Sequence, residues 1–164
     1  MSTHASILPG NSTRFRASLF SQALVLVTDF DSFRPLNRLT SVSVRRVLAD
    51  AWNDFRLERA RRRLAAGESA PPISVVRHWL HGQPYYVVSD GNHRTIAARD
   101  AGRCRIRAHI SSEATCTPTR FVLDSAAGRL WERTDSPCLR LVKDALNDDL
   151  MTLLVAIGVA PLPP

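Results

Sequence analysis

Lysine is almost missing from this 164-residue sequence, because Lys143 is the single lysine among 22 basic residues and the others are arginine. Against 15 acidic residues this gives a formal net charge of +7. A positive charge of this size favours polyanionic partners such as nucleic acid, nucleotides or an anionic surface. The arginine bias can equally reflect the coding composition of the source genome, so the charge alone is weak support for a nucleic-acid partner.

Cysteine is also scarce. Cys104, Cys116 and Cys138 are an odd number, widely spaced and without a CxxC pair. This pattern indicates neither a disulfide framework nor a zinc ribbon. Cys104, His109 and Cys116 can be grouped as metal ligands on paper, but reduced structural thiols and a strand histidine are the favoured interpretation. No metal site is predicted.

Long apolar runs are absent too. None reaches the roughly 18 residues needed to span a bilayer. Residues 1–16 lack the charged start and apolar centre of a secretory signal. We therefore expect a cytoplasmic protein with no membrane contact. A hydrophobic content of 45% with 23% charged residues suits a globular protein with one sizeable core.

The first third of the chain is predicted to contain one strand and two helices. Residues 1–20 are polar and lack periodicity, which indicates a loose arm. The apolar run 23–27 predicts a strand, and a proline within 31–38 predicts a loop there. Helical periodicity over 44–66 shifts near Asp54, the expected cap of the second helix.

The remainder is predicted to be rich in strands. Alternating residues over 72–88 predict a β-hairpin, followed by a helix over 95–101 and a strand over 105–110. A second hairpin is expected over 121–131. The last helix is predicted over 137–159, and its apolar side either packs on the domain or forms a homodimer interface. The expected fold class is α/β (α+β), with a mixed sheet and flanking helices.

The sequence DGNHR, residues 90–94, lies where a strand turns into a helix. The first amides of a helix are unpaired donors at the positive end of its dipole, so an anion such as phosphate fits there. Gly91 allows a tight turn and a close approach. Arg94 adds a fork-shaped donor for phosphate, and His93 adds a donor whose charge is adjustable.

The neighbouring polar residues extend this interpretation. Asn92 and Thr95 add neutral hydrogen bonds, while Asp90 can orient Arg94 or His93, cap the helix, or hold a magnesium ion. The simpler alternative is that Asp90 is only an N-cap and Arg94 a surface cation. The crowding of these residues favours a phosphate cradle, with His93 and Asp90 as the candidate catalytic residues.

Residues 34–111 resemble the ParB/sulfiredoxin superfamily. The resemblance rests on a helix ending at Gly67, the strand Pro-Ile-Ser-Val-Val from residue 72, a hairpin, the DGNHR motif, an Ala-Ala helix and a further strand. It implies a small ParB/sulfiredoxin-like domain whose glycine motif binds the phosphates of a nucleotide. The expected organisation is an arm over 1–20, this domain over 21–112, and a C-terminal hairpin and helix over 113–164 packed on it.

Members of this superfamily differ in what surrounds the motif. Sulfiredoxins carry a nucleophilic cysteine directly before His-Arg, where this chain has Asn92, so that route is excluded. ParB proteins use a Gly-x-Arg-Arg form, and His93 replaces the first arginine here. Free-serine kinases carry Asp-Gly-His-His-Arg, which this chain matches at four of five places. They also need an acidic base in the early loop, where this chain has Asn37, and an amide cannot take a proton.

The resemblance therefore implies a nucleotide-binding protein that hydrolyses, or is switched by, ATP or another nucleoside triphosphate, with or without Mg²⁺, and acts with DNA. Two alternatives stay open: a free-serine-type kinase using ATP or ADP, and a non-catalytic regulatory binding module. A carboxylate within reach of His93 and Arg94 would favour the enzymes. The candidates for it are Asp29, Asp31, Asp54 and Glu58.

Two arginines are added to the predicted site, and two tryptophans are assigned to the predicted core. Arg34 and Arg38 flank the loop that, by resemblance, faces the glycine motif, so both are candidates for phosphate binding. Trp52 and Trp131 lie in apolar patterns and are expected in the core rather than as stacking platforms.

Three arginines of the second predicted helix form a possible nucleic-acid contact. Arg56, Arg59 and Arg63 share one helix face at spacings of three and four. They could follow a nucleic-acid backbone. A solvated face with Glu58–Arg62 pairing is the simpler alternative.

Overall fold

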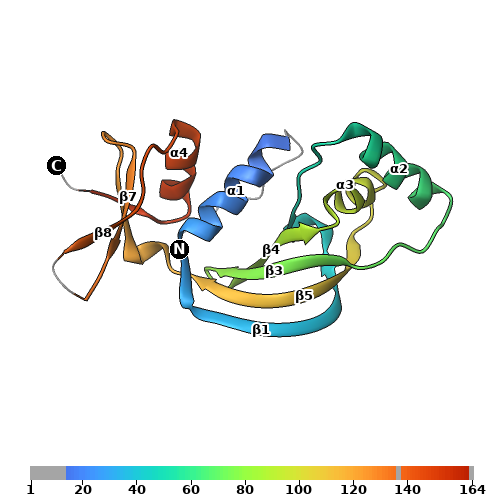
Figure 1. Cartoon of the computed structure of the whole chain (residues 1–164), viewed down its shortest axis with the longest axis horizontal. Helices are drawn as coiled ribbons and strands as arrows, with labels where there is room; N and C mark the ends of the chain where they lie inside the picture. Colours follow the sequence, from blue (N-terminus) through green and yellow to red (C-terminus); the bar gives the residue numbers. More distant parts are fainter. Residues whose placement is uncertain (1–13, 136–137, 163–164) are drawn as a thin grey trace, which may run out of the picture.

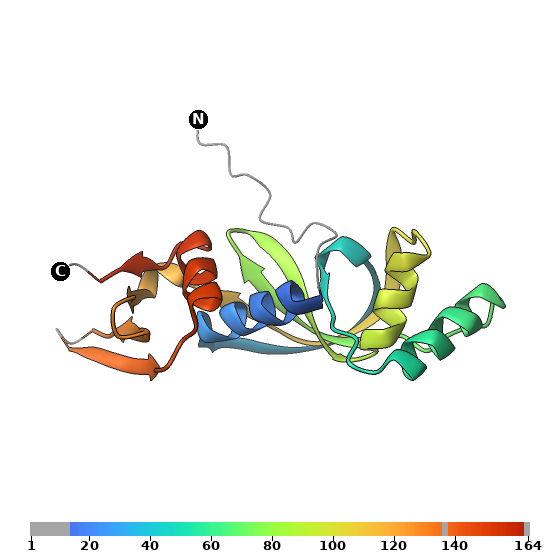
Figure 2. The ribbon, with the colours of Figure 1, turned by 90° about the horizontal axis from the view of Figure 1, so that it is seen from above.

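The structure is a computed structural model and describes residues 14–135 and 138–162. Residues 1–13 of the predicted arm lie outside the described residues. The described residues form two mixed β-sheets and four α-helices, so the predicted α+β class is confirmed. Figures 1 and 2 show an elongated molecule with one sheet and α4 at one end, α2 and α3 at the other, and α1 between them.

The first sheet carries the motif and has five strands in the order β1-β5-β3-β4-β2. β3 and β4 form the predicted hairpin, β3 runs parallel to β5, and β2 runs parallel to β4. The strands are β1 (Thr28–Ser43), β2 (Val47–Leu48), β3 (Ile73–Leu80), β4 (Gln83–Asp90) and β5 (Arg105–Cys116).

The second sheet has the order β8-β7-β6-β9, and its β6–β7 hairpin was predicted. Its strands are β6 (Phe121–Asp124), β7 (Arg129–Arg133), β8 (Leu139–Lys143) and β9 (Ala160–Pro161), and the 3-10 turn η2 (Pro118–Arg120) precedes them.

The single helix predicted over 137–159 is wrong in its first half. Residues 139–143 alternate and pair with β7 as strand β8. The helix α4 (Asp148–Ala156) starts only after Asn147, whose side-chain oxygen accepts a hydrogen bond from the Leu150 amide at 2.8 Å.

The strand predicted over 23–27 is also wrong, because this segment belongs to helix α1 (Arg14–Leu26). Residues 14–20, assigned to the loose arm, form its first turns. Phe20, Ala23, Leu24 and Val27 are buried. Their spacing of three and four residues is that of a helix face. Because the Val-Leu pair at 25–26 is also apolar, residues 23–27 form a continuous apolar run that resembles a strand.

Only the second helix predicted within 44–66 exists. It is α2 (Asp54–Ala65), and Asn53 rather than Asp54 caps it, accepting from the Arg56 amide at 2.9 Å. The first predicted helix is replaced by the 3-10 turn η1 (Val44–Arg46), strand β2 and an irregular stretch. Pairing of β2 with β4 overrides the local helical pattern here.

The loop predicted over 31–38 is part of β1. This strand lies at the edge of its sheet, where a proline removes no hydrogen bond that the sheet needs. The pairing with β5 is irregular between Asp29 and Arg34 and again between Pro35 and Arg38. These irregularities accommodate Pro35 and the left-handed backbone of Asn37.

The largest hydrophobic cluster joins both sheets through α1 and α4. Leu24 of α1, Leu130 of β7 and Leu154 of α4 are all fully buried in it. The apolar side of the last helix therefore packs on the rest of the chain, while a homodimer remains a prediction. Within residues 14–135 and 138–162, no helix combines the length and apolar character needed to cross a bilayer.

Leu154→Ala is expected to lower the free energy of unfolding by about 2–5 kcal/mol, because it opens a cavity in this shared core. Its neighbour Val155 is 47% exposed, so Val155→Ala is the matched control and should change stability by less than about 1 kcal/mol. Urea unfolding followed by far-UV circular dichroism measures both. Equal losses in the two variants would contradict the shared core.

Candidate functional site

The strand-to-helix turn at Gly91 builds the centre of the site. Gly91 is the N-cap residue of α3 (Asn92–Asp100) and has φ +99°, a conformation that favours glycine. A Cβ at this position would lie 2.5 Å from Cγ2 of Ile73. No side chain caps the helix, so Asp90 is not the N-cap. The first amides of α3 are therefore left for an anion.

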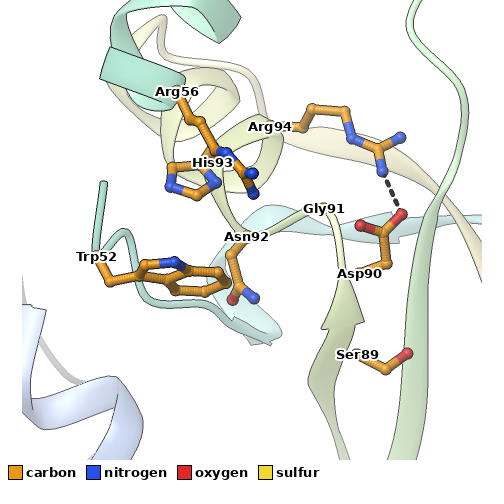
Figure 3. Close-up of a pocket in the computed structure, with 8 residues that line it drawn as sticks. All are labelled: Trp52, Arg56, Ser89, Asp90, Gly91, Asn92, His93 and Arg94. Carbon is orange, nitrogen blue, oxygen red and sulfur yellow. Dashed lines mark hydrogen bonds and ion pairs between the residues drawn. The ribbon is translucent and has the colours of Figure 1, made fainter. Parts of the chain in front are cut away.

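The whole DGNHR motif lines a hollow of about 140 Å³ at this turn (Figure 3). Three further residues complete its wall: one from the segment before α2, one from α2 and one from β4. None of them was predicted to belong to it. The lining residues are Trp52, Arg56, Ser89, Asp90, Gly91, Asn92, His93 and Arg94.

Three of the five N–H donors of the Arg94 guanidinium group are engaged in hydrogen bonds within the protein. Nη1 donates to the carbonyl oxygens of Pro71 and Pro72 at 2.5 and 3.0 Å. Nη2 donates to Oδ2 of Asp90 at 2.7 Å. Asp90 therefore orients Arg94, one of the roles expected for it. Arg94 fastens the start of β3 to α3 and has few donors left for a ligand.

His93 packs against Trp52, with 5.0 Å between ring centroids and an interplanar angle of 63° (Figure 3). Burial and then the charge of Arg56 lower the pKa of His93, while a hydrogen bond to the Asn53 backbone acts the other way. The ring is therefore neutral at pH 7 in the free protein. Its Nε2 is buried and has no partner among the described residues.

Trp52 contradicts the core prediction, because 69% of it is exposed. It lies on the irregular stretch after β2 rather than on a helix face, so its apolar spacing to Leu48 was misleading. Trp131, on β7, is half-buried. An exposed tryptophan beside a hollow is a ready stacking surface.

Arg56, predicted with Arg59 and Arg63 as a nucleic-acid contact, also borders the hollow; the nucleic-acid contact remains a prediction. Arg56 lies in the first turn of α2, is exposed, and is one of the residues that line the hollow. Among the described residues its guanidinium has no acidic partner. The expected Glu58–Arg62 pair is replaced by Glu58–Arg61 at 3.6 Å.

Two residues of the predicted cradle are engaged elsewhere. Asn92 lines the hollow, but its Oδ1 accepts a hydrogen bond from the Asp50 amide at 3.0 Å. Thr95 is fully buried and donates to the Gly91 carbonyl at 3.1 Å. Thr95 thus has no surface to offer a phosphate, which corrects that prediction.

The residues predicted from β1 do not line the hollow. Arg34 donates to the carbonyl oxygens of Asp31 and Phe33 within its own strand. Neither Arg34 nor Arg38 is among the lining residues. Asn37 contacts His109 on the neighbouring strand, with 2.5 Å between Oδ1 and Nε2. The local loop geometry assumed for these residues does not exist, because they belong to β1.

The carboxylate that would favour an enzyme does not come from the expected residues. Asp29 lies 3.5 Å from Arg120, Glu58 pairs with Arg61, and neither lines the hollow. Asp31 and Asp54 do not line it either. Asp90 is the single carboxylate in its wall, and it is tied to Arg94.

The cysteines form no metal cluster in the described part of the chain, where no three His, Cys, Asp or Glu side chains converge. Cys104 is exposed and Cys116 is buried. Burial raises the pKa of Cys116 to about 11, and a hydrogen bond with Thr28 opposes the shift. Cys116 is therefore an inert thiol.

No family model matches the chain, and no curated protein is significantly similar to it. Among solved structures it is similar to the crystal structure of sulfiredoxin from Arabidopsis thaliana. The TM-score is 0.38 and the sequence identity is 17%, over 48% of this chain and 88% of that one. Similarity at this level says nothing about the chemistry of the site.

Gly91→Ala is expected to cost roughly 2–5 kcal/mol of unfolding free energy, because the left-handed backbone costs about 1–2 kcal/mol and the clash with Ile73 about 1–3 kcal/mol more. Gly102→Ala is the matched control at the other end of α3. Its φ is +69°, but nothing lies within 4 Å of a Cβ there. Chemical denaturation gives both values, and equal losses would mean that the contact with Ile73 is unimportant.

Proposed function

We propose that this protein binds a nucleotide, with the phosphate groups held at the N-terminus of α3. The observation that carries the proposal is the convergence of uncapped helix amides at Gly91 and the unpaired guanidinium of Arg56 in one hollow. Both groups donate hydrogen bonds and favour negative charge, as a phosphate requires. The exposed face of Trp52 beside them distinguishes a nucleotide from a free phosphate.

The proposed ligand remains ATP or another nucleoside triphosphate, bound together with Mg²⁺. Asp90 is the proposed protein ligand of the ion, because its side chain is 74% exposed and lines the hollow. Carboxylate and phosphate oxygens are the ligands that Mg²⁺ takes in such sites.

The site supports binding or nucleotide-dependent switching better than catalysis. A general base must reach the proton that it removes. Asp90 is held by Arg94, and Nε2 of His93 is buried. In this arrangement His93 does not reach a substrate proton through Nε2, and Asp90, although 74% exposed, is ion-paired with Arg94 through Oδ2. The free-serine-type kinase is thereby disfavoured, and the non-catalytic module gains support.

Action with DNA remains part of the proposal. It rests on the net charge of +7 and on the arginines of α2. Arg59 is exposed and has no acidic partner among the described residues. Arg63 is held by Glu68 at 2.6 Å, so it contributes less free charge than the sequence indicated.

Arg56→Ala is expected to weaken ATP binding about ten- to a hundred-fold, because one or two charge-assisted hydrogen bonds are worth about 1.5–3 kcal/mol each. The melting temperature of this variant should equal that of the unmodified protein, since the Arg56 side chain forms no hydrogen bond or ion pair with a described residue. Isothermal titration calorimetry with ATP and Mg²⁺, together with differential scanning fluorimetry, measures both properties.

Arg59→Ala is the control for this variant, as it removes the same charge from the same helix outside the hollow. Arg94→Ala should differ from both by lowering the melting temperature as well as the affinity, because it breaks three internal hydrogen bonds. Unchanged ATP affinity in Arg56→Ala, or no binding by the unmodified protein, would refute the phosphate site.

We expect no phosphoserine when the protein is incubated with labelled ATP, Mg²⁺ and L-serine, because the one carboxylate among the described lining residues, Asp90, is ion-paired with Arg94. Any phosphate release should be indifferent to serine. Thin-layer chromatography separates the products, and an added arm with duplex DNA tests whether DNA alters nucleotide turnover. Phosphoserine that disappears in Arg94→Ala would instead establish the kinase alternative.

A further inference from the structure

A second hollow, of about 170 Å³, adjoins the first. Trp52 and Asn92 line both hollows, so the two share a wall. The second lies between α1, the segment from Leu48 to Trp52, and β4. A ligand with its phosphates at Gly91 could therefore extend past Trp52 into it.

The walls of this second hollow suit a flat ring with polar edges. Leu48, Val87 and Val88 supply apolar surface, and Ser18 and Ser21 of α1 supply hydroxyl groups. A mostly apolar hollow with a few placed polar groups is the usual form of a small-molecule site.

Asp50 lines this hollow and carries a polar atom without a partner among the described residues. Oδ1 of Asp50 is buried and has no hydrogen-bond partner among the described residues. The backbone amide of Asp50 is bonded to Asn92, which fixes the residue in place. Buried polar atoms in proteins almost always have partners, and a ligand or a water molecule can supply the partner for this one. Burial also raises the pKa of Asp50, and a hydrogen bond with Ser18 opposes that shift.

We propose that the second hollow binds the base of the nucleotide, and that Asp50 selects bases with an exocyclic amino group at the position found in adenine and cytosine. This inference rests on the proposed function, since the phosphates must lie at Gly91. A carboxylate oxygen accepts a hydrogen bond from that amino group. Hypoxanthine and uracil present a carbonyl oxygen at the same position, which repels it. Trp52 stacks on the ring between the two hollows.

The test compares nucleotides that differ at this one position. Calorimetric titrations with ATP and ITP, and with CTP and UTP, should show that the amino-bearing member of each pair binds at least about tenfold more tightly. Inorganic tripolyphosphate, which has no base, is the probe for the phosphate site alone.

Asp50→Asn keeps the shape of the side chain but offers an amide donor, so it should abolish or invert the preference for ATP over ITP. Tripolyphosphate should bind this variant as well as it binds the unmodified protein. Asp144→Asn, an exposed and distant change of equal charge, is the control. Trp52→Ala should weaken ATP binding while tripolyphosphate binding stays unchanged.

The outcomes separate the two proposals. Equal affinities for ATP and ITP, with tripolyphosphate still bound in an Arg56-dependent manner, would overturn the role of Asp50 and leave the phosphate site standing. No binding of tripolyphosphate or of any nucleotide would overturn both. Because the comparison of ATP with ITP uses the unmodified protein, it decides the question even if a variant fails to fold.

Discussion

The contact between Gly91 and Ile73 determines where the site lies. A side chain at position 91 would overlap Ile73, so only glycine lets α3 begin this close to β3. From that start, α3 fastens the segment before α2 at two points. Asn92 bonds the backbone at residue 50, and Arg99 donates to the carbonyl at residue 47 at 2.8 Å. The exposed tryptophan that follows is thereby placed beside the helix N-terminus (Figure 3).

The two arginines of the hollow have different tasks. Arg94, the arginine of the motif, donates three hydrogen bonds within the protein and keeps the shape of the cradle. A guanidinium group already satisfied in this way gains little from a further acceptor. Arg56 is exposed and unpaired among the described residues, so a bound anion gives it a partner that the free protein lacks. In the proposed site, the positive charge that contacts the ligand therefore comes from Arg56 of α2, while Arg94 of the motif holds the surrounding backbone in place.

Local patterns predicted the parts of the fold that depend on local forces. Both hairpins and the helix after the motif follow from alternation and turn residues, and they are confirmed. The helical spacing within residues 44–52 does not reveal that β2 pairs with β4, 39 residues later in the sequence. Trp52 was misplaced for the same reason. The motif could be located from sequence, but Arg56 reaches the hollow only through the packing of α2 against α3.

The second sheet contributes to the site although it holds none of the lining residues. Helix α1 forms one wall of the second hollow, and its opposite face is buried against α4 in the core that both sheets share. That core also compensates for the free-energy cost of two unpaired polar atoms near the site. Oδ1 of Asp50 and Nε2 of His93 are buried and have no partner among the described residues. Each such atom destabilises a protein by about 1–3 kcal/mol. In the proposed site, a ligand that donates a hydrogen bond to either atom would recover part of this free energy.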